Sequence, residues 1–128
     1  MRSFFKTRFQ SFRFAFSGWW YVVRSQQNAW IHVLASITVL LLGIWLNLLP
    51  RDWAVIILSV ALVWTAEFIN TALEAVVDLA SPEQHELART GKDVGAAAVL
   101  IAAGSSVLIG ILILGPPLWE RMQSYLSP

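Results

Sequence analysis

Four polar side chains interrupt the strongly apolar stretch "AEFINTALEAVVD", residues 66–78. They are Glu67, Asn70, Glu74 and Asp78. Intervals of three and four residues place them on one face of a helix, and we call this face the polar stripe. Carboxylates can act as general bases or hold divalent cations, but each costs about 2.5–3.5 kcal/mol inside a membrane on insertion scales. Helix pairing alone is a weaker explanation, because asparagine or serine would supply hydrogen bonds with less desolvation.

The polar stripe has a direction relative to a membrane. If the boundary lies near Asp78, the usual rise per residue makes Glu67 deeper than Glu74 by about 10 Å and deeper than Asp78 by about 16 Å. The stripe would then run from the cytosolic surface into the inner leaflet. Because one helix cannot cover several buried carboxylates, we expect the stripe to face another subunit or a wet cleft.

Two classes of membrane protein use such buried acids. An enzyme could use the deep carboxylate as a base and the shallower ones to hold a cation, whereas a small cation or proton-coupled transporter would use them as stations for its ion. A transport route needs polar stations through both leaflets. The outer half of each apolar stretch holds none, so the sequence favours an enzyme that acts on a substrate within the membrane.

Three apolar stretches are long enough to cross a membrane, since about 20 helical residues span about 30 Å of hydrocarbon. They cover residues 30–49, 53–77 and 94–114. With 57% hydrophobic and 13% charged residues and no cysteine, the chain is predicted to be one all-α membrane domain, residues 1–128, without disulfides. Between the first two stretches, "LPRDW" resists burial and predicts a tight helical hairpin.

Residues 1–29 are predicted to form an amphipathic helix and a linker. Aromatic side chains recur at intervals of three and four, cations lie on a separate face, and such a helix would lie in the membrane interface. The dispersed charges do not fit a signal peptide. Lysines and arginines are concentrated in this segment and before the third stretch, which predicts a cytoplasmic amino terminus and an external carboxyl terminus.

Residues 78–93 are expected to form a cytoplasmic loop. Ser81, Pro82 and Gln84 have the spacing of a helix start and Gly91 that of a helix end, which predicts a short separate helix. Small residues in the third stretch, such as Gly95, predict close helix packing.

The charges of "HELARTGKD", residues 85–93, fit either a solvated loop or a phosphate-binding segment. In the second case Lys92 would neutralise phosphate charge and Asp93 would orient the ligand. A Walker A motif and the protein-kinase motifs are absent from the sequence.

Taken together, "AEFINTALEAVVD" and "HELARTGKDVGAAAVL" resemble the prokaryotic diacylglycerol kinase and undecaprenol kinase family, and the similarity extends from "SFRFAFSG" through the third stretch. The resemblance implies a homotrimeric bundle in the bacterial inner membrane, with active sites between subunits. It also implies Mg²⁺-dependent transfer of the γ-phosphate of ATP to a lipid hydroxyl, of diacylglycerol first and undecaprenol as the alternative. No nucleic acid is expected as a partner.

The resemblance also assigns roles to individual residues. It implies that Glu67 is the catalytic base, that Glu74 and Gln26 bind the metal, and that Asn70 and Asp78 line the site. The nucleotide-binding residues that it implies are Phe14, Gln26, Glu74, Glu83, His85, Lys92 and Asp93.

Two positions depart from the family pattern, and a third, His32, lies outside it. Gln26 stands where the family commonly has a glutamate, and its amide oxygen is a neutral ligand for a hard cation. The position of the family's nucleotide-contacting arginine falls on Thr7, with Arg8 beside it. His32 is interpreted as a boundary histidine that donates to a backbone carbonyl, with a role in the site as the alternative.

Overall fold

The computed structural model describes residues 2–81, 83 and 85–126, with side chains from residue 10 onward except Gln27. These residues form four helices and no strand: α1 (Arg2–Ser25), α2 (Gln27–Trp45), α3 (Pro50–Ala80) and α4 (Glu86–Leu126). The helices α2, α3 and α4 are each long and apolar enough to cross a membrane. The predicted all-α class with three spanning helices is therefore confirmed, and each of the three helices extends beyond at least one end of the stretch predicted for it.

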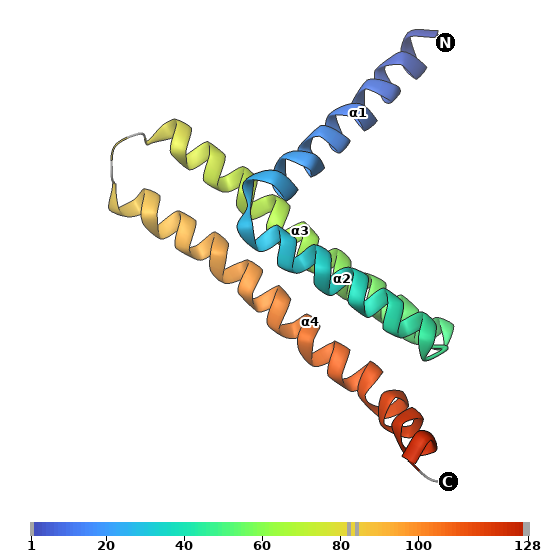
Figure 1. Ribbon diagram of the computed structural model, residues 1–128. Coiled ribbons are helices and arrows are strands. Elements are labelled where there is room, and N and C mark those ends of the chain that lie inside the picture. Colours follow the sequence, from blue (N-terminus) through green and yellow to red (C-terminus); the bar gives the residue numbers. More distant parts are fainter. Residues whose placement is uncertain (1, 82, 84, 127–128) are drawn as a thin grey trace.

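Helix α3 lies at the centre of the arrangement (Figure 1). It forms its most extensive contact with α4, which runs antiparallel to it, and α2 runs along another side of α3. Helix α1 leaves the bundle at a steep angle, and only its carboxyl-terminal part approaches α2 and α3 (Figure 1). The buried side chains Val22 and Val23 lie in that part. A helix is thus confirmed for the amino-terminal segment, while its placement in the membrane interface stays a prediction.

The turn between α2 and α3 lies earlier in the chain than predicted. Asn47 adopts the left-handed conformation with φ 54°, which asparagine tolerates better than most residues. The amide of Asn47 donates to the carbonyl of Ile44, and the amide of Leu48 donates to that of Gly43, both at 3.1 Å, which is a Schellman ending. Pro50 then starts α3, because a first helical residue needs no amide donor. The hairpin is confirmed, but its break is Leu46–Leu49 and not Pro50–Asp52.

The predicted short helix in the loop before the third stretch is wrong. Ser81 ends α3 instead of starting a helix, and its hydroxyl donates to the carbonyl of Glu83. Gly91 lies inside α4, which begins at Glu86 and runs without interruption through the third span. Pro82 and Gln84 lie outside the described residues. The charged segment 86–93 therefore continues the third membrane helix as a rigid extension.

Close packing of α3 against α4 is confirmed at Gly95. A Cβ atom at this position would collide with the Oδ1 atom of Asn70 and approach Leu73 to 3.1 Å. The glycine therefore lets α4 pass directly over the polar stripe. At Gly104 and Gly110 an added Cβ atom would contact nothing within 4 Å, so within this chain they are not required for close packing.

Candidate active site along the polar stripe

Burial of the polar stripe increases from Asp78, near the carboxyl-terminal end of α3, toward the middle of this helix. Asp78 is exposed and Glu74 is half-buried, whereas Asn70 is 7% exposed and Glu67 is 2% exposed. The inner half of the stripe is therefore covered by the same chain. This differs from the expectation that the stripe as a whole would face another subunit or a wet cleft, because α2 and α4 both pack on this face of α3.

Glu74 is held by two amide groups. The Nε2 atom of Gln26 donates to Glu74 Oε2 at 2.9 Å, and the Nδ2 atom of Asn70 donates to Glu74 Oε1 at 3.0 Å. Gln26 can reach Glu74 because it lies at the break between α1 and α2, with extended backbone (φ −102°, ψ 119°) and no side-chain cap to the helix. The structure thus brings together the two residues for which the family resemblance implies metal binding.

The carboxylate of Glu74 suits a magnesium ion, while the amides of Gln26 and Asn70 present N–H groups to it in this structure. Magnesium prefers hard oxygen ligands and is usually bound by one or two carboxylates together with substrate phosphates. Asn70 Oδ1 is a buried acceptor beside Glu74 that has no hydrogen-bond partner. No group of three or more metal-binding His, Cys, Asp or Glu side chains occurs among the described residues. The protein would therefore contribute few charged ligands, and a nucleotide would have to supply the others.

A charged cleft of about 770 Å³ lies next to the exposed end of the polar stripe. Four of the predicted site residues line it together with Asp78, namely Glu83, His85, Lys92 and Asp93. Lys92 Nζ donates to Asp78 Oδ1 at 2.7 Å, which connects α4 to the stripe on α3. The structure thus gathers the predicted loop residues into one concave surface.

Arg89 is a lining residue of this cleft that the sequence analysis did not assign to the site. Its Nε atom lies 3.8 Å from Asp93 Oδ2, one helical turn away. The sequence could have indicated Arg89 as a site residue, because intervals of three and four place residues 89, 92 and 93 on one side of a helix. The predicted helix end at Gly91 separated Arg89 from Lys92 and Asp93 and obscured that spacing.

The structure does not bring Phe14 to the other predicted nucleotide-binding residues. Phe14 lies on the outer side of α1 and is 72% exposed. It lines neither the charged cleft nor the groove beside α1. The side chains of Thr7 and Arg8 lie outside the described part of the chain, so the choice between them stays open.

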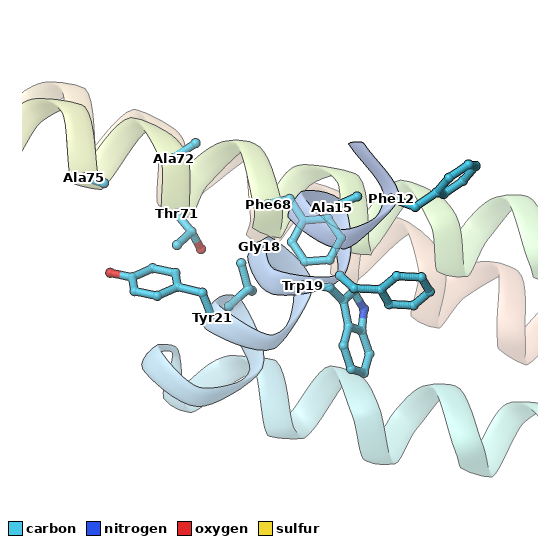
Figure 2. Close-up of a pocket in the computed structure, with 11 residues that line it drawn as sticks. Phe12, Ala15, Gly18, Trp19, Tyr21, Phe68, Thr71, Ala72 and Ala75 are labelled. Atoms are coloured by element: carbon cyan, nitrogen blue, oxygen red, sulfur yellow. The ribbon is translucent and has the colours of Figure 1, made fainter. Parts of the chain in front are cut away.

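An apolar groove of about 850 Å³ lies between α1 and α3. Figure 2 shows Phe68, Thr71, Ala72 and Ala75 of α3 opposite aromatic and small residues of α1, including Ala15, Gly18 and Trp19. Glu67 does not line the groove, but its neighbours Phe68 and Thr71 do. The Thr71 hydroxyl donates to the Glu67 carbonyl at 2.9 Å. The groove therefore lies along the segment of α3 that carries Glu67, although the Glu67 side chain does not line it.

The interpretation of His32 as a histidine that donates to a backbone carbonyl is wrong. His32 Nε2 is buried, has no hydrogen-bond partner and lies 3.7 Å from Glu67 Oε2. The alternative, a place in the site, fits the structure because α2 turns this side chain toward the deepest carboxylate of the polar stripe.

Comparison with known proteins agrees with this arrangement. Residues 13–114 match the family described as prokaryotic diacylglycerol kinase. A diacylglycerol kinase of Synechocystis sp. is 42% identical over 113 residues, which make up 88% of this chain and 65% of that protein. An undecaprenol kinase of Bacillus subtilis is 37% identical over 110 residues, 86% of this chain and 89% of that protein. A diacylglycerol kinase of Escherichia coli is 38% identical over 101 residues, 73% of this chain and 83% of that protein.

The family match covers most of the chain and includes the polar stripe, Gln26 and the charged cleft. It confirms the family and the class of enzyme expected from the sequence, and it decides against the transporter. The chain belongs to the prokaryotic diacylglycerol kinase family of lipid kinases.

Proposed function

We propose that the protein transfers the γ-phosphoryl group of ATP to the hydroxyl group of a membrane lipid, with diacylglycerol as acceptor and phosphatidic acid as product. The observation that carries this proposal is the polar stripe, which runs from a charged cleft at the cytosolic end to a buried carboxylate beside an apolar groove. A nucleotide from the cytosol and a lipid from the bilayer could meet along it.

The proposed role of each residue depends on its position along the polar stripe. Lys92 and Arg89 place positive charge at the cleft, where the phosphates of ATP would bind, and phosphoryl transfer depends largely on such positioning. Glu74 would hold Mg²⁺, which neutralises phosphate charge when bound, and the amides of Gln26 and Asn70 would turn to offer their oxygen atoms. Glu67 would accept the proton of the lipid hydroxyl as its oxygen bonds to phosphorus.

The family resemblance and the distribution of charge also support a proposal for the oligomeric state and for the orientation in the membrane. We propose a homotrimer in the bacterial inner membrane, with the amino terminus and the charged cleft on the cytoplasmic side. Many large apolar side chains of α2 and α4 are exposed in the single chain, for example Leu41, Leu108 and Leu112, and lipid or neighbouring subunits would cover them.

Undecaprenol is the second candidate acceptor, because a relative matched over 86% of this chain and 89% of its own length is named undecaprenol kinase. The protein reconstituted in vesicles with ATP labelled at the γ-phosphate and Mg²⁺ should label diacylglycerol faster than undecaprenol at equal mole fraction. Faster labelling of undecaprenol would reassign the substrate. Cation flux independent of ATP, without any labelled lipid, would contradict the proposed reaction.

A further inference from the structure

The deep carboxylate of the polar stripe has one charged or titratable contact within the described residues, and it is a histidine. The side chains of His32 and Glu67 are 12% and 3% exposed, and their nearest nitrogen and oxygen atoms are 3.7 Å apart. This distance is too long for a hydrogen bond, so Nε2 remains a buried atom without a partner. A small rotation of either side chain would join them. Such unpaired polar atoms are costly when buried, and they cluster where a site uses them.

The residues around His32 hold its imidazole ring near Glu67. Trp64 of α3 meets the imidazole edge-on, with ring centroids 6.1 Å apart and an interplanar angle of 70°. The Nε1 atom of Trp64 donates to Ser36 Oγ at 3.1 Å, one turn along α2 from His32. On the side of Trp64 that faces α1, Trp19 packs with a centroid distance of 6.1 Å. Trp64 of α3 therefore contacts both α1 and α2 and supports the imidazole ring of His32.

His32 also lines a cleft of about 500 Å³ between α2, α3 and α4. The polar residues of this cleft besides His32 are Ser36, Ser59 and Ser106, and the remaining lining residues are apolar or glycine. No acidic or basic side chain lines it. The imidazole is therefore the titratable group at the boundary between this cleft and Glu67.

We propose that His32 is a positioning residue for Glu67, holding its carboxylate toward the lipid hydroxyl and relieving it of the proton after transfer. The inference rests on the proposed lipid kinase reaction. In that reaction the lipid oxygen bonds to phosphorus, the bond between the γ-phosphorus and the ADP oxygen breaks, and the hydroxyl proton moves to Glu67. The proton then passes from Glu67 to His32 Nε2, and the imidazolium loses it to the aqueous phase as the products leave the site.

The physical need for such a partner follows from the burial of Glu67. The charged form of a carboxylic acid is poorly solvated at this depth, so the proton that Glu67 accepts needs a nearby group to take it away. Imidazole exchanges protons readily near neutral pH. A neighbouring histidine would therefore return the base to its active form without requiring water at Glu67 itself.

The test uses the full chain in vesicles with diacylglycerol, and compares His32→Ala with Ser36→Ala. Ser36 lies on the same side of α2, lines the same cleft and contacts Trp64, so it reports loss of packing without loss of the imidazole. We expect His32→Ala to lower kcat by about 10- to 100-fold, at the lower end of general acid–base effects, with KM for ATP and lipid changed less than about twofold. Ser36→Ala should stay within about twofold of wild type.

Added imidazole should restore part of the lost kcat in His32→Ala, because the cleft beside residue 32 can admit it, and should restore none in Ser36→Ala. If His32→Ala does not fold, His32→Gln provides the same comparison, since it keeps a polar side chain but cannot take the proton. A kcat within twofold of wild type, or an equal loss in both alanine variants without imidazole rescue, would overturn the proposal for His32. A wild-type protein that labels no lipid would instead overturn the reaction on which it rests.

Discussion

Replacing Glu67 by glutamine is expected to lower kcat for lipid phosphorylation by about 10²- to 10⁴-fold, the usual contribution of a general base. Glutamine has nearly the same size and fits the same buried position, but it cannot accept the hydroxyl proton. The charged cleft, where we propose that ATP binds, lies at the other end of the polar stripe and is not lined by Glu67. Binding of ATP with Mg²⁺ should therefore stay within about twofold of wild type, measured by equilibrium titration of the purified variant.

The control for this change is Glu120→Gln, which makes the same substitution on an exposed part of α4 away from the stripe. It should leave both activity and nucleotide binding unaltered. Turnover like that of wild type in Glu67→Gln would remove Glu67 from the reaction. A loss of nucleotide binding as large as the loss of activity would mean that Glu67 supports the nucleotide site and not the chemistry.

Replacing Glu74 by glutamine should raise the magnesium concentration for half-maximal activity by about tenfold or more, in line with the effect of altering groups around a metal site. The change removes the carboxylate that accepts hydrogen bonds from Gln26 and Asn70, and a neutral amide attracts a hard cation less strongly. At saturating magnesium, part of the activity should return. A magnesium titration at fixed ATP measures both effects.

Gln26→Glu is the paired variant and should shift the magnesium midpoint in the opposite direction. Its new carboxylate would lie close to that of Glu74, since the present amide is 2.9 Å from Glu74 Oε2. The two carboxylates would repel each other without a cation and would hold a divalent ion together. An unchanged or raised midpoint in Gln26→Glu would place Gln26 outside the metal site, and an unchanged midpoint in Glu74→Gln would do the same for Glu74.

The polar stripe and the number of helices could be predicted from the sequence because both depend on local spacing. Intervals of three and four residues determine which side chains share a helical face, and long apolar stretches determine which helices can cross a membrane. The resemblance to a known family added the pairing of Gln26 with Glu74. These two residues are 48 positions apart, and no local pattern connects them.

The remaining features depend on how the helices are rotated and joined. The contact between His32 and Glu67 arises because α2 presents one particular side to α3, and a single sequence does not give that rotation. The end of α3 at Ser81 was mistaken for a start, since serine followed by proline suits either a helix end or a helix start. Helix α4 continues through Gly91, because one glycine inside a long helix costs only about 1 kcal/mol and does not by itself end the helix.

The central claim is that the hydroxyl group of the lipid meets Glu67 beside the apolar groove. A diacylglycerol analogue with an epoxide in place of the hydroxyl group tests it most directly, because a carboxylate opens the epoxide and keeps the lipid as an ester that mass spectrometry of peptides can locate. We predict that the ester forms on Glu67 in the wild-type protein, and that excess diacylglycerol prevents it. Labelling of Glu74 or Asp78 with Glu67 unmodified would contradict the account, because it would place the lipid hydroxyl at the cytosolic end of the polar stripe.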